Sequence, residues 1–239
     1  MQREHVRWFS PAVERDMDLL VFGHAGARVL VFPSSMGRFF EWEDQGMIAA
    51  LTEHLERGWL QLCCVDSVDA ESWYAKWKHP ADRARYHARY DRYLHDEVLP
   101  FTRHRNENPF LITTGASFGA YHALTFALRH PFEIGRSIGL SGVYDIREIT
   151  DGYTDGDVYP FNPPEFLVHE HDGERIAALQ RLDLILAIGR DDRMRGNSEY
   201  FSGRLWERGI GNALRIWDGW AHDWPYWRQM IVRYIGGQD

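Results

Sequence analysis

The chain has 239 residues, a length that fits one large domain, and we expect a single domain over residues 1–239. Hydrophobic residues make up 44% of the sequence and charged residues 26%, the balance of an ordinary globular protein. The formal net charge of −8 at pH 7 argues against a nucleic-acid partner, because nucleic-acid phosphates require a basic surface. No apolar run approaches the roughly 18 residues of a membrane span, and the N-terminus lacks the apolar core of a signal peptide, so we expect no membrane partner.

The two cysteines, Cys63 and Cys64, are adjacent within an apolar run. Neighbouring residues on a strand point to opposite faces, so a disulfide between them would be strained. Two cysteines are also too few for a disulfide framework or for a zinc site made of cysteines. We therefore expect a cytoplasmic protein in a reducing compartment.

Short apolar runs alternate with amphipathic segments along the chain, a pattern typical of strands and helices around a parallel sheet. Near the start, residues 19–22 and 29–32 are apolar and are separated by a glycine-containing turn at 23–26, which predicts a β-hairpin. The pattern then predicts a helix over 47–55 ended by Gly58, a strand over 60–65 and a charged surface helix over 81–98. One side of that surface helix carries an aromatic stripe, Tyr86, Tyr90, Tyr93 and Leu94, which we interpret as packing.

The second half continues the alternation of strands and helices. It predicts strands over 110–113, 137–140, 182–188 and 214–217, and helices over 121–128, 198–208 and 225–235. Residues 144–174 are rich in Asp, Gly, Pro and aromatics without periodicity, so we expect a long excursion that covers a site. The fold class predicted is α/β: a mostly parallel central sheet with an antiparallel start and helices on both faces.

The sharpest chemical signal is the pentapeptide Gly115-Ala116-Ser117-Phe118-Gly119. A serine nucleophile between a strand end and a helix start needs a tight turn, where bulky side chains two positions to either side would collide with their neighbours. Such a turn exposes the Ser117 hydroxyl and offers the Phe118 N–H as an oxyanion donor. The predicted strand before the motif and the helix after it favour this interpretation over an incidental serine in a glycine-rich turn.

A serine hydroxyl needs a base, and the base needs an orienting acid, each expected after a later strand of the sheet. The predicted strand 182–188 is followed by Asp191 and Asp192. We favour Asp192 as the acid, because a Gly-x-x-Asp turn lets its side chain bend back over the end of the strand. Asp191 stays open as the alternative. Among the 12 histidines, His222 alone follows the final predicted strand, in a small loop before a helix, so it is the predicted base. His122, in the helix after the serine, is expected to pack in the interior.

The second oxyanion donor is expected from the loop after the early strand, Phe32-Pro33-Ser34-Ser35-Met36-Gly37. The backbone N–H of Ser35 is the predicted donor. Ser34 and Met36 stay open as alternatives, because a shift of one residue in the loop would exchange them.

The sequence resembles the Putative esterase family of α/β-hydrolases, which includes esterase D (S-formylglutathione hydrolase) and the mycolyltransferases. The motifs that carry the resemblance are Gly115-Ala-Ser117-Phe-Gly119, Gly189-Arg-Asp-Asp192 and Trp220-Ala-His222-Asp-Trp224, in the required order. The resemblance spans Val29 to Ile235 and implies that the single domain expected over 1–239 is an α/β-hydrolase domain, with Ser117 as nucleophile, His222 as base and Asp192 as acid. The chain departs from many α/β-hydrolases in its early loop, where Pro33-Ser34-Ser35 stands in place of a His-Gly pair.

Together these residues predict a serine hydrolase that cleaves small-molecule carboxylic esters through an acyl-enzyme. The alternatives are an acyltransferase that uses an alcohol or amine acceptor, and a catalytically silent binding protein that reuses the fold. No metal or organic cofactor is implied, because H-E-x-x-H, cysteine-cluster, P-loop and dinucleotide motifs are missing from the sequence. The oligomeric state is left open.

Five aromatic residues fall close to the predicted catalytic loops: Trp42, Trp73, Tyr74, Trp220 and Trp224. If they line the site, they favour an ester with an apolar or aromatic body over a charged metabolite. The alternative is that they are ordinary core and rim packing.

Overall fold

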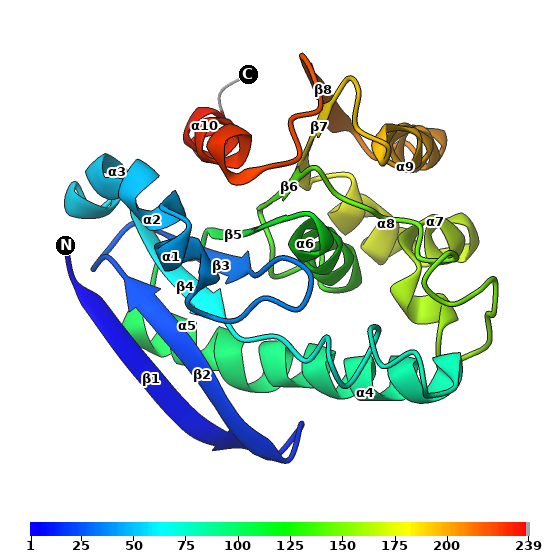
Figure 1. Cartoon of the computed structure of the whole chain (residues 1–239), viewed down its shortest axis with the longest axis horizontal. Coiled ribbons are helices and arrows are strands. Elements are labelled where there is room, and N and C mark those ends of the chain that lie inside the picture. Colours follow the sequence, from blue (N-terminus) through cyan, green and yellow to red (C-terminus); the bar gives the residue numbers. More distant parts are fainter. Residues whose placement is uncertain (238–239) are drawn as a thin grey trace.

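An eight-stranded sheet runs through the structure, a computed structural model that describes residues 1–237 (Figure 1). Its strands are β1 (Arg3–Ser10), β2 (Arg15–Phe22), β3 (Ala27–Phe32), β4 (Leu60–Val65), β5 (Leu111–Ala116), β6 (Arg136–Leu140), β7 (Asp183–Gly189) and β8 (Asn212–Trp217). They lie in the order β1-β2-β4-β3-β5-β6-β7-β8. The pairings of β1 with β2 and of β2 with β4 are antiparallel, and all other neighbours are parallel. The predicted mostly parallel sheet with an antiparallel start is confirmed.

The predicted hairpin between residues 19–22 and 29–32 is wrong. Both segments are strands, β2 and β3, but β4 lies between them, antiparallel to β2 and parallel to β3. The hairpin partner of β2 is β1, which pairs with it from end to end. Because β1 is an edge strand with mostly exposed, polar side chains, its sequence lacks the apolar run that marks a buried strand.

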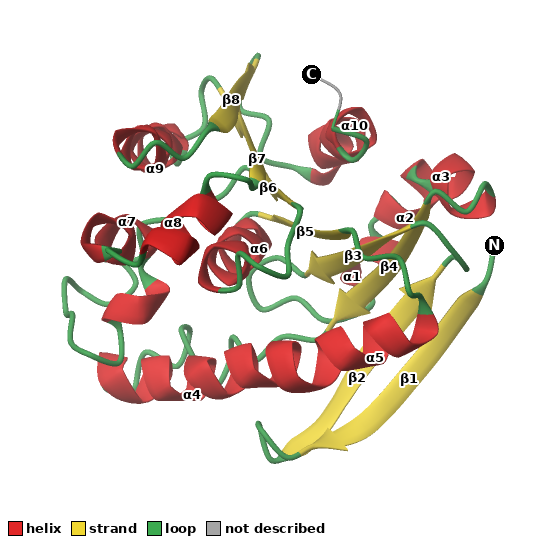
Figure 2. Cartoon of the chain, turned by 180° about the vertical axis from the view of Figure 1, so that it is seen from behind, coloured by secondary structure: helices red, strands yellow, loops and turns green. Residues whose placement is uncertain are grey.

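Helices cover both faces of the sheet, as predicted (Figures 1 and 2). One face carries α4 (Pro80–Arg92), α5 (Leu99–Arg105), α6 (Phe118–Arg129) and α9 (Arg195–Glu207), and the other carries α1 (Glu41–Asp44), α2 (Met47–Ala50), α3 (Thr52–Glu56) and α10 (Trp224–Tyr234). Cys63 lies in the core on the first face and Cys64 in the core on the second, as expected for neighbours on one strand.

Two predicted helices differ from the structure in extent. The charged helix is present as α4 and continues through a π-helical turn, Tyr93–Val98, into α5. Its Tyr90, Tyr93 and Leu94 are buried in the core, which confirms that the aromatic stripe is packing. The helix predicted over 47–55 is divided into α2 and α3, which meet at Leu51.

The segment 144–174 leaves the sheet after β6 and returns toward β7, as predicted, but part of it is helical. It contains two 3₁₀ turns, Tyr159–Phe161 and Leu167–His169, and α7 (Pro163–Phe166), and it runs into α8 (Gly173–Leu179). Its apolar side chains, Ile146, Val158 and Phe161, pack with Phe118 and Tyr121. The excursion therefore covers the first turn of α6, the helix that follows Ser117.

Candidate active site

Ser117 occupies a strained turn between the end of β5 and the start of α6. Its backbone angles are φ 55° and ψ −119°, a conformation that residues other than glycine rarely adopt. The Ser117 N–H donates to the carbonyl of Leu140 at the end of β6, at 2.8 Å, and this bond holds the turn at the carboxyl edge of the sheet. Backbone strain of this kind is concentrated at functional sites.

The glycines on either side of Ser117 are required by close backbone contacts. A Cβ atom on Gly115 would lie 2.3 Å from the carbonyl carbon of Gly119. A Cβ atom on Gly119 would lie 2.4 Å from the carbonyl oxygen of Pro33. The nucleophile turn therefore packs directly against residues 33–37, which we name the Ser35 loop.

His222 lies in the loop between β8 and α10, within hydrogen-bonding distance of the serine. Its Nε2 is 3.1 Å from Ser117 Oγ. The loop is held by Ser141, whose hydroxyl donates to the carbonyl of Ala221 at 2.9 Å and accepts from Trp227 Nε1 at 3.0 Å. The imidazole also stacks on Trp220, with ring centroids 5.6 Å apart.

Asp192 follows β7, and its buried carboxylate contacts the other nitrogen of the His222 ring. The distance from Asp192 Oδ2 to His222 Nδ1 is 2.7 Å, and Oδ1 accepts the N–H of Met194 at 2.9 Å. Asp191, the alternative acid, is exposed, and its N–H donates to the carbonyl of Gly219. The structure thus brings Ser117, His222 and Asp192 into one chain of hydrogen bonds and leaves Asp191 outside it.

Backbone N–H groups beside the serine were predicted as oxyanion donors. Phe118 is the first residue of α6, where N–H groups have no partner within the helix. In the Ser35 loop, the N–H of Ser34 donates to Glu41 at 2.7 Å and the N–H of Met36 donates to Asp69 at 3.1 Å. No acceptor for the Ser35 N–H exists within the described part of the chain. Of the three candidates for the second donor, Ser34 and Met36 are occupied and Ser35 is left.

Three side chains outside the predicted catalytic and oxyanion residues hold the Ser35 loop. Glu41 accepts both the N–H and the hydroxyl of Ser34, and burial raises the pKa of its carboxyl against the opposing effect of these bonds. Asp69 accepts the N–H of Met36, and the Tyr74 hydroxyl donates to Ser35 Oγ at 2.7 Å. Motif spacing carries no signal for these contacts, because they depend on the conformation of two loops.

The five aromatic residues near the catalytic loops divide into two groups. Trp42 and Trp73 are fully buried in the core, so for them the packing interpretation is correct. Tyr74 is partly buried and meets the Phe118 ring edge to face at 5.2 Å. Trp220 is 52% exposed and Trp224 is partly exposed. An apolar substrate surface can therefore come from Tyr74, Trp220 and Trp224.

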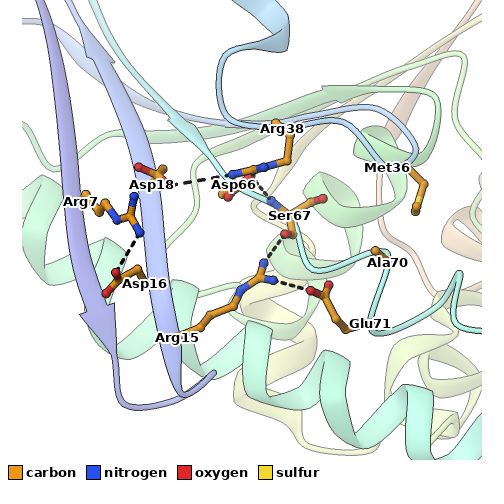
Figure 3. Close-up of a pocket in the computed structure, with 10 residues that line it drawn as sticks. All are labelled: Arg7, Arg15, Asp16, Asp18, Met36, Arg38, Asp66, Ser67, Ala70 and Glu71. Carbon is orange, nitrogen blue, oxygen red and sulfur yellow. Dashed lines mark hydrogen bonds and ion pairs between the residues drawn. The ribbon is translucent and has the colours of Figure 1, made fainter.

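A polar pocket of about 320 Å³ lies beside Met36 of the Ser35 loop, between the β1–β2 hairpin and the segment after β4 (Figure 3). Its charged side chains pair with one another: Arg7 with Asp16 at 2.9 Å, Arg15 with Glu71 at 2.5 Å and Arg38 with Asp66 at 2.6 Å. Arg15 also donates to the carbonyl of Ser67 at 2.8 Å. This network joins the hairpin to the loops at the carboxyl ends of β3 and β4.

Residues 1–237 hold neither a metal-binding cluster nor a membrane-spanning helix. Over that range, no three His, Cys, Asp or Glu side chains are grouped so that they could hold a metal ion. The helices found there fall short of the length and apolar character that crossing a bilayer requires.

A protein-family model described as Putative esterase matches residues 41–236. The matched range covers most of the chain and contains Ser117, Asp192 and His222. Ser35 lies outside it. A search of curated protein sequences gave no match.

Several solved structures are similar to this chain over nearly its whole length. The ferulic acid esterase AmCE1/Fae1A from the anaerobic fungus Anaeromyces mucronatus has a TM-score of 0.74 at 13% identity, covering 99% of this chain and 90% of that one. The S-formylglutathione hydrolase FrmB from Staphylococcus aureus has a TM-score of 0.69 at 18% identity, covering 98% and 95%. MPT51 (FbpC1) from Mycobacterium tuberculosis has a TM-score of 0.68 at 16% identity, covering 99% and 97%. At these identities the similarity establishes the fold.

Gly119→Ala is expected to lower the free energy of unfolding by about 1–3 kcal/mol, because the added methyl group would force the Ser35 loop aside. Denaturant unfolding followed by tryptophan fluorescence measures the change. The matched control is Gly203→Ala in α9, where a Cβ atom meets nothing within 4 Å. There the same substitution should raise stability by about 0.5–1 kcal/mol. Equal effects at the two positions would contradict the close contact at Gly119.

Proposed function

We propose that this chain, which belongs to the Putative esterase family and is a carboxylic ester hydrolase, cleaves its substrate through an acyl-enzyme formed on Ser117. The observation that carries the proposal is the chain of hydrogen bonds from Ser117 Oγ through His222 to Asp192, at 3.1 and 2.7 Å. A serine hydroxyl becomes a nucleophile when a base in this position can take its proton. Asp192 accepts the Nδ1–H of the ring, which leaves Nε2 able to accept that proton.

In the proposed reaction, Ser117 Oγ attacks the carbonyl carbon of the ester while His222 Nε2 takes the hydroxyl proton. The negative charge that develops on the carbonyl oxygen is stabilised by the N–H groups of Phe118 and Ser35. His222 then gives its proton to the leaving alcohol, and the acyl group stays on Ser117. A water molecule attacks the acyl-enzyme with His222 again acting as base, which releases the acid and restores the serine. Asp192 holds the ring in place and stabilises the imidazolium.

Hydrolysis is favoured over acyl transfer by the exposure of the base. The His222 side chain is 20% exposed, so the ring that carries Nε2 is not closed off from water. A transferase would need to keep water away from this nitrogen while an acceptor binds. The complete set of nucleophile, base and acid weighs against a silent binding protein.

The proposed substrate is a small ester whose acyl group has an apolar body. Tyr74 lies against Phe118 and Trp220 stacks on His222, and both rings are partly exposed. Trp224, two residues after His222, is also partly exposed, and such rings suit an aliphatic or aromatic group. A ferulic acid esterase shares the fold, which adds an aromatic acyl group to the candidates. The cytoplasmic location stays part of the proposal, and it is supported by two cysteines that are both free and buried.

Ser117→Ala is expected to lower kcat at least about 10⁴-fold with no change in fold, because removing the nucleophile disables the whole catalytic unit. Hydrolysis of a p-nitrophenyl ester measures the activity, and labelling by a fluorophosphonate reports the nucleophile directly. Near-normal turnover or labelling in the variant would sink the assignment of Ser117.

Asp192→Asn is expected to lower kcat by about 10³–10⁴-fold, because the amide favours the wrong tautomer of His222. Asp191→Asn is the matched control, since it makes the same chemical change on the neighbouring exposed residue. The control should keep nearly full activity. A larger loss for Asp191→Asn than for Asp192→Asn would reverse the choice of acid.

A panel of p-nitrophenyl esters is expected to show higher kcat/KM for butyrate, octanoate and benzoate than for acetate, because the larger acyl groups bury apolar surface against the exposed rings. Trp220→Ala should lower kcat/KM for the larger esters more than it lowers kcat/KM for acetate.

Adding methanol to the assay and measuring the amounts of methyl ester and free acid compares acyl transfer with hydrolysis. Methyl ester as the main product at low methanol concentration would favour the transferase.

A further inference from the structure

A second buried aspartate–histidine pair lies next to the catalytic residues. Asp69, in the segment after β4, is fully buried, and its Oδ1 is 2.9 Å from Nε2 of His122. His122 is on α6, five residues after Ser117, and its side chain is 1% exposed. The other carboxylate oxygen of Asp69 accepts the N–H of Met36 at 3.1 Å. One carboxylate therefore joins the nucleophile helix to the Ser35 loop.

This pair cannot serve as a second catalytic base. His122 Nε2 is engaged by Asp69, and the remaining ring nitrogen, Nδ1, is buried without a hydrogen-bond partner among the described residues. His87, whose ring centroid lies 5.3 Å from that of His122, adds no positive charge, because burial lowers its pKa well below the usual value. The pair is thus enclosed. Its polar contact outside the pair is with the N–H of Met36 in the Ser35 loop, and it offers no exposed nitrogen to a substrate.

The bond from Met36 to Asp69 fixes the backbone next to the proposed oxyanion donor. Met36 has φ 60°, a left-handed conformation that costs a residue with a Cβ and needs a compensating contact. On the other side of Ser35, the carbonyl of Ser34 accepts the N–H of Gly37 at 2.9 Å. The two peptide groups that flank Ser35 are both held, so the direction of the Ser35 N–H is set.

The same pair also contacts the other side of the proposed oxyanion hole. The His122 ring meets the Phe118 ring edge to face, with centroids 4.9 Å apart. Phe118 supplies the first proposed donor, and Ser35 supplies the second. A change in the Asp69–His122 distance would therefore move the loop that carries one donor relative to the helix that carries the other.

We propose that Asp69, held by His122, is a positioning residue that aims the Ser35 N–H at the carbonyl oxygen of the ester. This inference rests on the proposed function, because it concerns stabilisation of the oxyanion in the Ser117 reaction. It assigns Asp69 and His122 no contact with the substrate. Loss of the pair should therefore reduce the rate of the chemical step and leave substrate binding nearly unchanged.

Asp69→Asn tests the proposal, because the amide keeps the size of the carboxylate but has a single acceptor oxygen for two N–H donors. We expect kcat for an oxygen ester to fall about 10–100-fold with little change in KM, because a misplaced donor should cost less than the roughly 10²–10³-fold that a lost donor costs. The decisive measurement compares the ester with the thionoester in which sulfur replaces the carbonyl oxygen. Sulfur is a weak acceptor, so the ratio of oxygen ester to thionoester rates should fall by about the same factor as kcat.

Substitutions of His122 test the pair independently if Asp69→Asn does not fold. His122→Gln can keep an N–H donor near the position of Nε2 and should retain most of the rate ratio, whereas His122→Phe removes the donor and should lower it. The matched control is Asp91→Asn, which removes another buried carboxylate, one paired with Arg129 at the far end of α6. The control should change stability without changing the ratio.

The outcomes separate this inference from the proposed function. A lowered ratio in Asp69→Asn or His122→Phe, with the ratio of Asp91→Asn unchanged, supports the positioning role. Equal loss of oxygen-ester and thionoester rates in the folded variants would overturn it, because a general structural role moves both rates together. If Ser117→Ala keeps its activity, the proposed function fails; if Ser117→Ala is inactive but the ratio stays constant in the variants, the positioning role alone fails.

Discussion

The close contact between the nucleophile turn and the Ser35 loop is the constraint on which the rest of the site depends. Gly119 lies so near the carbonyls of Phe32 and Pro33 that any side chain would collide with backbone atoms. This contact places the start of α6 next to the loop after β3. The N–H groups of Phe118 and Ser35, from different elements, can therefore donate to the same carbonyl oxygen of the ester. The strained φ of Ser117 is maintained by the same packing and by the bond to Leu140.

Much of the proposed site could be predicted because it follows from the topology of a parallel sheet. Ser117, Asp192 and His222 each lie within a few residues of the end of a parallel strand, and the carboxyl ends of these strands share one edge. Residues far apart in the chain can therefore be assigned to one place from strand order alone. Glu41 and Asp69 could not be predicted in this way, because their contacts depend on how the loops bend after the strands have ended.

The errors in the predicted fold have physical causes that can be named. β1 carries polar side chains because it has a neighbour on one side only, so apolar periodicity cannot reveal it. Without β1, the two apolar runs at 19–22 and 29–32 looked like each other's partners. The position of β4 between them follows from a crossover connection between β3 and β4, which local spacing does not record. The helical content of 144–174 was missed because its turns are too short to show a period.

The two aspartate–histidine pairs show why residue type alone does not determine the part a histidine plays. In both pairs a ring nitrogen lies within 3 Å of a buried carboxylate, at 2.7 Å in Asp192–His222 and 2.9 Å in Asp69–His122. The difference lies at the second nitrogen: in His222 it meets Ser117 Oγ, and in His122 it has no partner in the described range. His222 can reach the hydroxyl because a loop carries it across the edge of the sheet. His122 lies on α6, the helix that follows Ser117, and its ring is buried and bonded to Asp69. It therefore does not reach the Ser117 hydroxyl.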